Sequence, residues 1–89
     1  MTLEEFARAL ATYCETLGGS VTRWFSTAQH NAAVGGDPRS LHRIGLAADV
    51  VYDVRPPIER ARAVAEPLGL YVWPEVDHHH VRAGDRVWV

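Results

Sequence analysis

The fold is predicted most clearly by the segment Ser40-Leu41-His42-Arg43-Ile44-Gly45-Leu46-Ala47-Ala48-Asp49-Val50-Val51-Tyr52. Its second half, which continues to Val54, concentrates β-branched and aromatic residues and predicts the main strand of a sheet, from Ala47 to Val54. Asp49 falls inside that strand, where an ionised carboxylate without a partner would cost several kcal/mol of desolvation. We therefore expect a cationic partner for Asp49, either an arginine or a metal ion.

One helix is predicted before this strand in the sequence and another after it. Thr2-Leu3-Glu4-Glu5 has the form of a capping box, and apolar residues then recur every three or four positions as far as Leu17, before Gly18-Gly19. Pro56-Pro57 ends the main strand and opens a second helix, whose inward positions are Ile58, Ala61, Val64, Ala65 and Leu68.

Shorter strands complete the predicted sheet. They run from Ser20 to Phe25, from Leu70 to Trp73 and from His79 to Arg82, and Arg86 to Val89 is a candidate for one more. The segment from Asn31 to Arg39 contains Gly35-Gly36-Asp37-Pro38 and is expected to be an irregular, ordered loop. This order predicts one α+β domain over residues 1–89, a small, mainly antiparallel sheet with helices packed on one face.

Composition narrows the function classes. The chain has 9 basic and 11 acidic residues, every basic one is arginine, and the charges are interspersed, so we expect no nucleic-acid partner. Cys14 is the single cysteine, which excludes an intrachain disulfide framework. No apolar run approaches the roughly 20 residues of a membrane span, and the first residues are acidic rather than basic. We therefore expect no membrane insertion, and synthesis in the cytoplasm without a signal peptide.

Histidines gather in the segment Glu75-Val76-Asp77-His78-His79-His80-Val81. Imidazole nitrogens and carboxylate oxygens are common zinc ligands, and two histidines with one aspartate would leave a fourth position for water. In a regular strand His78 and His80 share a face, and Asp77 would point to the opposite one. Asp77 and His80 can therefore act together only if Asp77 lies in a turn before the strand, and His78 is an alternative ligand or a substrate contact.

Two motifs resemble a known family. Ser40-x-His42-x-x-Gly45-x-Ala47-x-Asp49, followed by Asp77-x-x-His80-Val81, resembles the zinc D-alanyl-D-alanine peptidases and the related L-alanyl-D-glutamate endopeptidases of bacterial and phage cell-wall metabolism, which share a fold with the Hedgehog signalling domain. Asn31-Ala32-Ala33-Val34-Gly35-Gly36 also resembles the loop that precedes this motif in phage members. The resemblance covers about residues 20–82.

The resemblance implies a role for each matched residue. His42, Asp49 and His80 would be zinc ligands and Asp77 the catalytic carboxylate. His78 is not part of the matched motif, and from its place on the same face as His80 we expect it to orient substrate or the oxyanion. The family usually has an arginine before the Asn-x-x-x-Gly-Gly loop. This chain has Ser26 there, and Arg23 is the expected substitute, with Arg39 and Arg43 as outside candidates. Ser40 is expected to cap the turn that carries His42 and is our candidate substrate-binding residue.

The function that the resemblance implies is hydrolysis of a peptide bond next to a D-amino acid in the peptidoglycan stem peptide, by a zinc peptidase that acts on the cell wall after release, as a phage endolysin does. Enzymes that cleave D-Ala-D-Ala and enzymes that cleave L-Ala-D-Glu share the motif, so the motif does not tell which of the two bonds is cleaved. The alternatives are a non-catalytic zinc-binding module of the same fold and an arginine-paired fold without metal. Trp24, Trp73 and Trp88 are expected in the core or at its rim, and one of them could line a substrate groove.

Overall fold

The structure, a computed structural model, describes residues 1–36 and 39–85. The predicted last strand from Arg86 to Val89, including Trp88, lies outside the described residues, as do Asp37 and Pro38 of the predicted loop. The elements are, in chain order, α1 (Leu3–Leu17), β1 (Gly19–Arg23), α2 (Ala28–Ala33), the 3-10 helix η1 (Leu41–Ile44), β2 (Ala47–Tyr52), α3 (Ile58–Ala65), the 3-10 helix η2 (Glu66–Leu68), β3 (Leu70–Pro74) and β4 (His79–Ala83).

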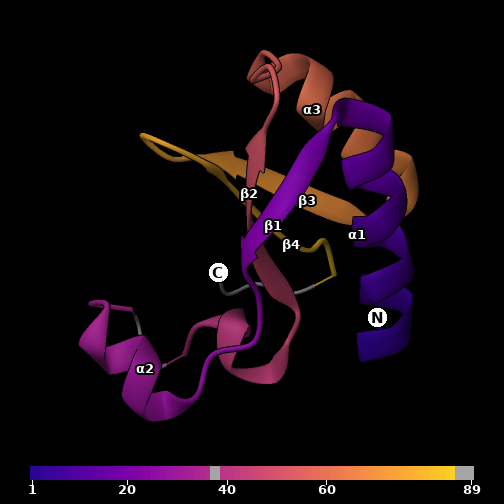
Figure 1. Cartoon of the computed structure of the whole chain (residues 1–89). Helices are drawn as coiled ribbons and strands as arrows, with labels where there is room; N and C mark the ends of the chain where they lie inside the picture. The colour runs from indigo at the N-terminus through magenta and orange to yellow at the C-terminus, as the bar shows by residue number, and fades with distance from the viewer. Residues whose placement is uncertain (37–38, 86–89) are drawn as a thin grey trace.

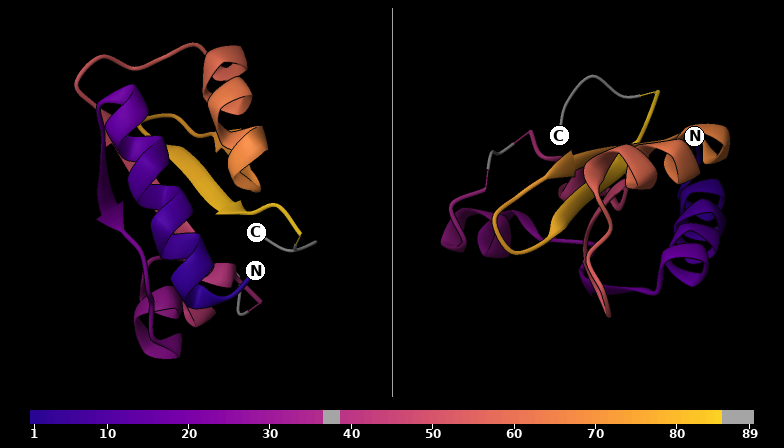
Figure 2. Two further views of the ribbon diagram at one scale, coloured as in Figure 1. Left: turned by 90° about the vertical axis from the view of Figure 1, so that its right-hand side faces the viewer. Right: turned by 90° about the horizontal axis from the view of Figure 1, so that it is seen from above.

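The four strands form one sheet in the order β1-β2-β4-β3, and each neighbouring pair is antiparallel. Helices α1 and α3 lie together over one face of this sheet (Figure 2, left), whereas α2 and η1 lie beyond the ends of β1 and β2 (Figure 1). The predicted α+β class, with an antiparallel sheet and helices on one face, is confirmed. In the part of the chain that the structure describes, no helix is long and apolar enough to cross a membrane.

Helix α1 begins and ends as its sequence predicts. The Thr2 hydroxyl accepts a hydrogen bond from the Glu5 amide, and the Glu5 carboxylate accepts one from the Thr2 amide, which completes the capping box. Gly18 ends the helix in the left-handed conformation, with φ of 67°. The buried side chains of α1 are Phe6, Leu10, Tyr13 and Leu17.

The alternation of strand residues divides the sheet into two chemically different faces. Val50, Val72 and Val81 are fully buried against the helices. His79 shares this face, because its Nδ1 atom hydrogen-bonds the Tyr52 hydroxyl (2.9 Å), which in turn bonds the Tyr13 hydroxyl of α1 (2.6 Å). The neighbours of these residues along the strands, Asp49 and His80, therefore lie on the other face, away from α1 and α3.

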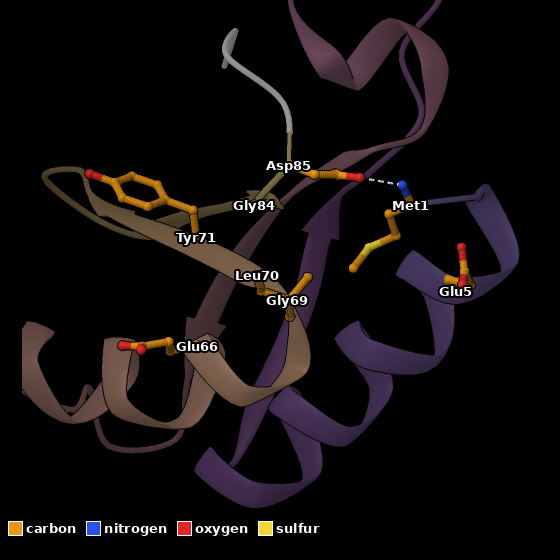
Figure 3. A pocket seen from close by; sticks show the side chains of 8 residues that line it. All are labelled: Met1, Glu5, Glu66, Gly69, Leu70, Tyr71, Gly84 and Asp85. Carbon is orange, nitrogen blue, oxygen red and sulfur yellow. Dashed lines mark hydrogen bonds and ion pairs between the residues drawn. The ribbon is translucent and has the colours of Figure 1, made fainter.

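The N-terminus is attached to the end of the sheet. The Met1 amino group forms an ion pair with Asp85, and the two residues border a hollow of about 620 Å³ beside Gly69, Leu70 and Tyr71 (Figure 3). As far as the described residues go, this hollow has no histidine or cysteine in its lining. The ion pair beside this hollow joins the start of α1 to the end of β4.

Three local predictions were wrong. Asn31 to Ala33 were expected to be irregular but belong to α2, because the Thr27 hydroxyl accepts a hydrogen bond from the His30 amide and caps a short helix. β1 was expected to reach Phe25 but ends at Arg23, since Trp24 donates from Nε1 to the Gly45 carbonyl and leaves the sheet. β2 likewise ends at Tyr52 rather than Val54.

Candidate metal centre

His42 lies in a turn that fixes its imidazole ring. The Ser40 hydroxyl accepts a hydrogen bond from the His42 amide (3.2 Å), as predicted for a local cap. Gly45 ends the turn at φ of 73°, where a side chain would also collide with Leu3. The His42 Nδ1 atom lies 2.8 Å from the Trp24 carbonyl oxygen, which can only accept. Nδ1 therefore carries the proton, and the lone pair of Nε2 points away from Trp24.

That lone pair faces a carboxylate. His42 Nε2 lies 3.1 Å from Oδ1 of Asp49, and Nδ1 of His80 lies 3.6 Å from the same oxygen. Two acceptors at this distance repel each other unless a cation lies between them, either a further proton on the imidazole or a metal ion. That cation would be the expected partner of Asp49, and none of the described residues brings an arginine within ion-pair distance of the carboxylate.

His42, Asp49 and His80 together could hold a metal ion. One ligand atom from each residue lies within 4.8 Å of the others, although the residues come from η1, β2 and β4. His80 approaches Asp49 through its Nδ1 atom, and the other ring nitrogen, Nε2, is buried and makes no hydrogen bond within the described residues. Two nitrogens and one oxygen are a donor set that metal ions accept.

Electrostatics keep the Asp49 carboxylate ionised. Burial alone would raise the pKa of Asp49, but the imidazoles of His42, His80 and His78 beside the carboxylate favour its charged form, outweigh burial and hold this pKa well below its usual range. An ionised carboxylate is the form that binds metal, so the group is ready to act as a ligand at neutral pH.

The three residues line a cleft of about 810 Å³ on the face of the sheet away from α1 and α3. Its other lining residues come from the segment between α2 and η1, from the loop after β3 and from strands β1, β3 and β4: Arg23, Val34, Gly35, Ser40, Tyr71, Trp73, Glu75, His78 and Arg82. The predicted substrate residue Ser40 therefore borders the cleft while it caps the His42 turn. Of the two tryptophans in the described part of the chain, Trp73 lines the cleft and Trp24 packs against Phe6.

Arg23 reaches the position that Ser26 holds in the motif. Its Nη2 atom donates to the Ser26 hydroxyl (3.1 Å) and to Oδ1 of Asn31 (3.0 Å), and both of these partners are buried and uncharged. Gly36 packs directly on Asn31, because its amide donates to the Asn31 carbonyl and a Cβ atom there would collide with that residue. The guanidinium is thus fixed at the cleft by neutral groups, which leave its charge for an anion.

Asp77 and His78 form a pair at the mouth of the cleft. Asp77 lies in a bend before β4, as its predicted role required, and its carboxylate lies 2.7 Å from His78 Nδ1. The opposite nitrogen, His78 Nε2, lies 3.6 Å from Oδ1 of Asp49. The Asp77 side chain is 86% exposed and does not line the cleft, so among the described residues it is His78 that brings this pair to the metal group. The hydrogen bond from His78 holds the pKa of Asp77 below its usual range.

Sequence reasoning missed the residue that organises this bend. Arg55 donates from its guanidinium to the backbone carbonyls of Glu75, Val76 and His78, and so holds together the loop between β3 and β4. No sequence signal marks it, because an arginine just after a strand is usually a solvated residue. Glu75 at the cleft was noted only as part of the histidine-rich segment. Arg39 and Arg43, the outside candidates for the arginine of the family, do not line the cleft.

Comparisons with protein-family models, with curated proteins and with solved structures gave no match to this chain. Its function is therefore inferred from the geometry of the described residues together with the motif resemblance.

Proposed function

We propose that this protein is a zinc peptidase that hydrolyses a peptide bond next to a D-amino acid in peptidoglycan stem peptides. The observation that carries the proposal is the convergence of His42, Asp49 and His80 within 4.8 Å, in the order and with the residue types of the cell-wall peptidase motifs. Under this proposal the chain has the Hedgehog-like variant of the α+β fold, and it acts on the cell wall after release from the cell that makes it.

The donor set supports zinc as the metal in this proposal. Two histidines and one carboxylate are the usual three protein ligands of hydrolytic zinc sites, and they leave a fourth position open. When bound, zinc acts as a Lewis acid and lowers the pKa of a water molecule to about 7. The Trp24 carbonyl supports this use of His42, because a hydrogen bond on the far ring nitrogen orients a ligand and increases its basicity.

The proton shuttle in this proposal is Asp77 acting through His78. His78 Nε2 points to the cleft and can accept a proton there, while the Asp77 carboxylate stabilises the resulting imidazolium at Nδ1. The proton then returns from Nε2 to the leaving amine. Arg55 has a positioning role, since its bonds to the 75–78 backbone hold both members of the pair.

Arg23 is the proposed anion clamp. It provides a guanidinium held by Ser26 and Asn31 at the cleft, where a substrate carboxylate or the developing oxyanion can be bound. Ser40, at the same cleft, is proposed to contact the substrate backbone with the second lone pair of its hydroxyl.

A second candidate is a non-catalytic zinc-binding module of the same fold. The observation that favours it is the 86% exposure of Asp77, whose carboxylate lies outside the cleft lining. In such a module the His-Asp-His group would stabilise the domain or a partner interface. The module would catalyse no reaction, and Asp77 would have no catalytic role.

Mass spectrometry of stem peptides separates these candidates. Zinc-loaded protein is incubated with purified stem peptides, beside a chelated sample, Asp77→Ala, and Asp53→Ala as a matched exposed aspartate outside the cleft. We expect cleavage by the wild type and by Asp53→Ala. The chelated sample should not cleave because it has lost zinc, and Asp77→Ala should not cleave although it keeps zinc. Wild-type protein that binds zinc but cleaves no stem peptide would favour the binding module.

A further inference from the structure

A single row of side chains crosses all four strands at the level of the metal group. In the strand register Arg23 of β1 is opposite Asp49 of β2, Asp49 is opposite His80 of β4, and His80 is opposite Trp73 of β3. All four residues line the same cleft. Neighbouring strands are about 4.8 Å apart, so the row is about 14 Å long, which is the length of about four extended residues.

Trp73 forms the end of this row opposite Arg23. Its side chain is about half exposed, an unusual state for a tryptophan that is one strand away from a buried histidine. The guanidinium of Arg62 lies 6.0 Å from the centre of its ring, and Arg62 Nε donates to the carbonyl of Val72, so the indole is supported from α3. A supported, half-exposed indole is a stacking surface for a ligand.

The surroundings of Trp73 favour a sugar over an apolar side chain. Glu75 and Arg82 line the cleft on the same side, and Tyr71 is packed beneath the Arg82 guanidinium, 4.5 Å from its ring centre. A pyranose ring presents a CH-rich face that stacks on an indole and hydroxyl groups that hydrogen-bond carboxylate and guanidinium. An apolar side chain would satisfy the indole only and would desolvate the two charged groups.

From this row we propose that Trp73 is the subsite for the sugar that carries the stem peptide. The inference rests on the proposed function and specifies its substrate. With the anionic end of the peptide at Arg23 and the reacting bond at the metal group, the opposite end of the peptide lies at Trp73. Only about one strand spacing separates His80 from Trp73, which leaves room for one amino acid between the bond and the sugar. The bond cut is then L-Ala-D-Glu rather than D-Ala-D-Ala.

Matched substrates with and without the sugar test this inference. Kinetics are measured for the zinc-loaded wild type on a stem tetrapeptide and on the same peptide attached to N-acetylmuramic acid. We expect kcat/KM to be roughly tenfold higher for the sugar-bearing substrate, through KM rather than kcat. Trp73→Ala should abolish this preference and Trp73→Phe should keep most of it. Phe25→Ala, which removes an aromatic that is 65% exposed outside the cleft, should leave the preference unchanged.

A binding measurement separates failure of this inference from failure of the proposed function. The indole N–H signal of Trp73 is followed by NMR in the Asp77→Ala protein and is assigned by its loss in Trp73→Phe. This signal should shift when the sugar-bearing peptide is added, but not when the sugar-free peptide is added. Wild-type cleavage without sugar preference, or an equal shift with both peptides, would overturn the sugar subsite and leave the peptidase intact. A sugar-specific shift in a protein that cleaves neither peptide would refute the peptidase and keep the subsite.

Discussion

The two faces of β4 use the same residue type in opposite ways. His79 points to α1 and joins a closed chain of hydrogen bonds with Tyr52 and Tyr13, whereas His80 points to the cleft and keeps a buried ring nitrogen without a partner among the described residues. A buried polar group on a packed face must be satisfied by the protein, because nothing else can reach it. On the cleft face, His80 turns its Nδ1 atom toward Asp49 (3.6 Å), within the group of residues that could hold a metal ion, so the two faces differ in whether the protein itself satisfies the histidine.

The largest expected effect is loss of metal from the cleft face. His42→Ala or His80→Ala should lower zinc affinity by more than about 100-fold, since even partners behind the ligands contribute 10- to 100-fold. Zinc content after dialysis, measured by elemental mass spectrometry, checks this. His30→Ala is the matched control, because His30 is an exposed histidine of α2 away from the cleft. Full zinc occupancy in both cleft variants would refute the metal centre.

Arg23 should have the next largest effect. Arg23→Ala should lower kcat/KM on a stem peptide by about 100-fold, because a charge-assisted contact to the substrate is lost. Arg43→Ala, at an exposed arginine that does not line the cleft, is the control. Steady-state kinetics with zinc saturating check the difference, and equal activity of the two variants would show that Arg23 is only structural.

On the core face the effect should be on stability alone. Tyr52→Phe removes the hydroxyl that links Tyr13 to His79 and should lower the free energy of unfolding by about 1–3 kcal/mol. Tyr71→Phe is the control on the cleft face. Urea unfolding at neutral pH measures the stability, and zinc content should stay at the wild-type level. A Tyr52→Phe variant that keeps full stability but loses zinc would contradict the division between the two faces.

This division also explains what could be read from the sequence. Alternation along β4 predicted that His78 and His80 share a face, and the capping box predicted the start of α1, because both signals depend on neighbours within a few residues. The grouping of His42, Asp49 and His80 was implied by the resemblance of the two motifs to the cell-wall peptidases. The contact of Trp24 with His42 and the bonds of Arg55 to the 75–78 loop join distant segments, and no local pattern encodes them.

The smallest effect concerns the core face at alkaline pH. Burial raises the pKa of Tyr52 well above its usual range, and the hydrogen bond to Tyr13 adds to this; burial likewise raises the pKa of Tyr13. The unfolded tyrosines lose protons near pH 10 while the folded ones retain them, so the folded state binds more protons there and stability must fall as pH rises above about 10. The absence of lysine leaves few other groups that titrate in this range, although Cys14, whose pKa burial also raises, adds in the same direction.

Chelated protein isolates this effect from metal binding. The urea midpoint of the wild type should decrease from about pH 9 to about pH 11, and Tyr52→Phe should show a shallower decrease than Tyr71→Phe, because it removes the tyrosine whose pKa is raised most clearly. Equal slopes for the two variants would mean that the Tyr13-Tyr52-His79 chain opens to solvent before the domain unfolds. Solvent would then reach the core face as it reaches the cleft, and the contrast between His79 and His80 would no longer hold.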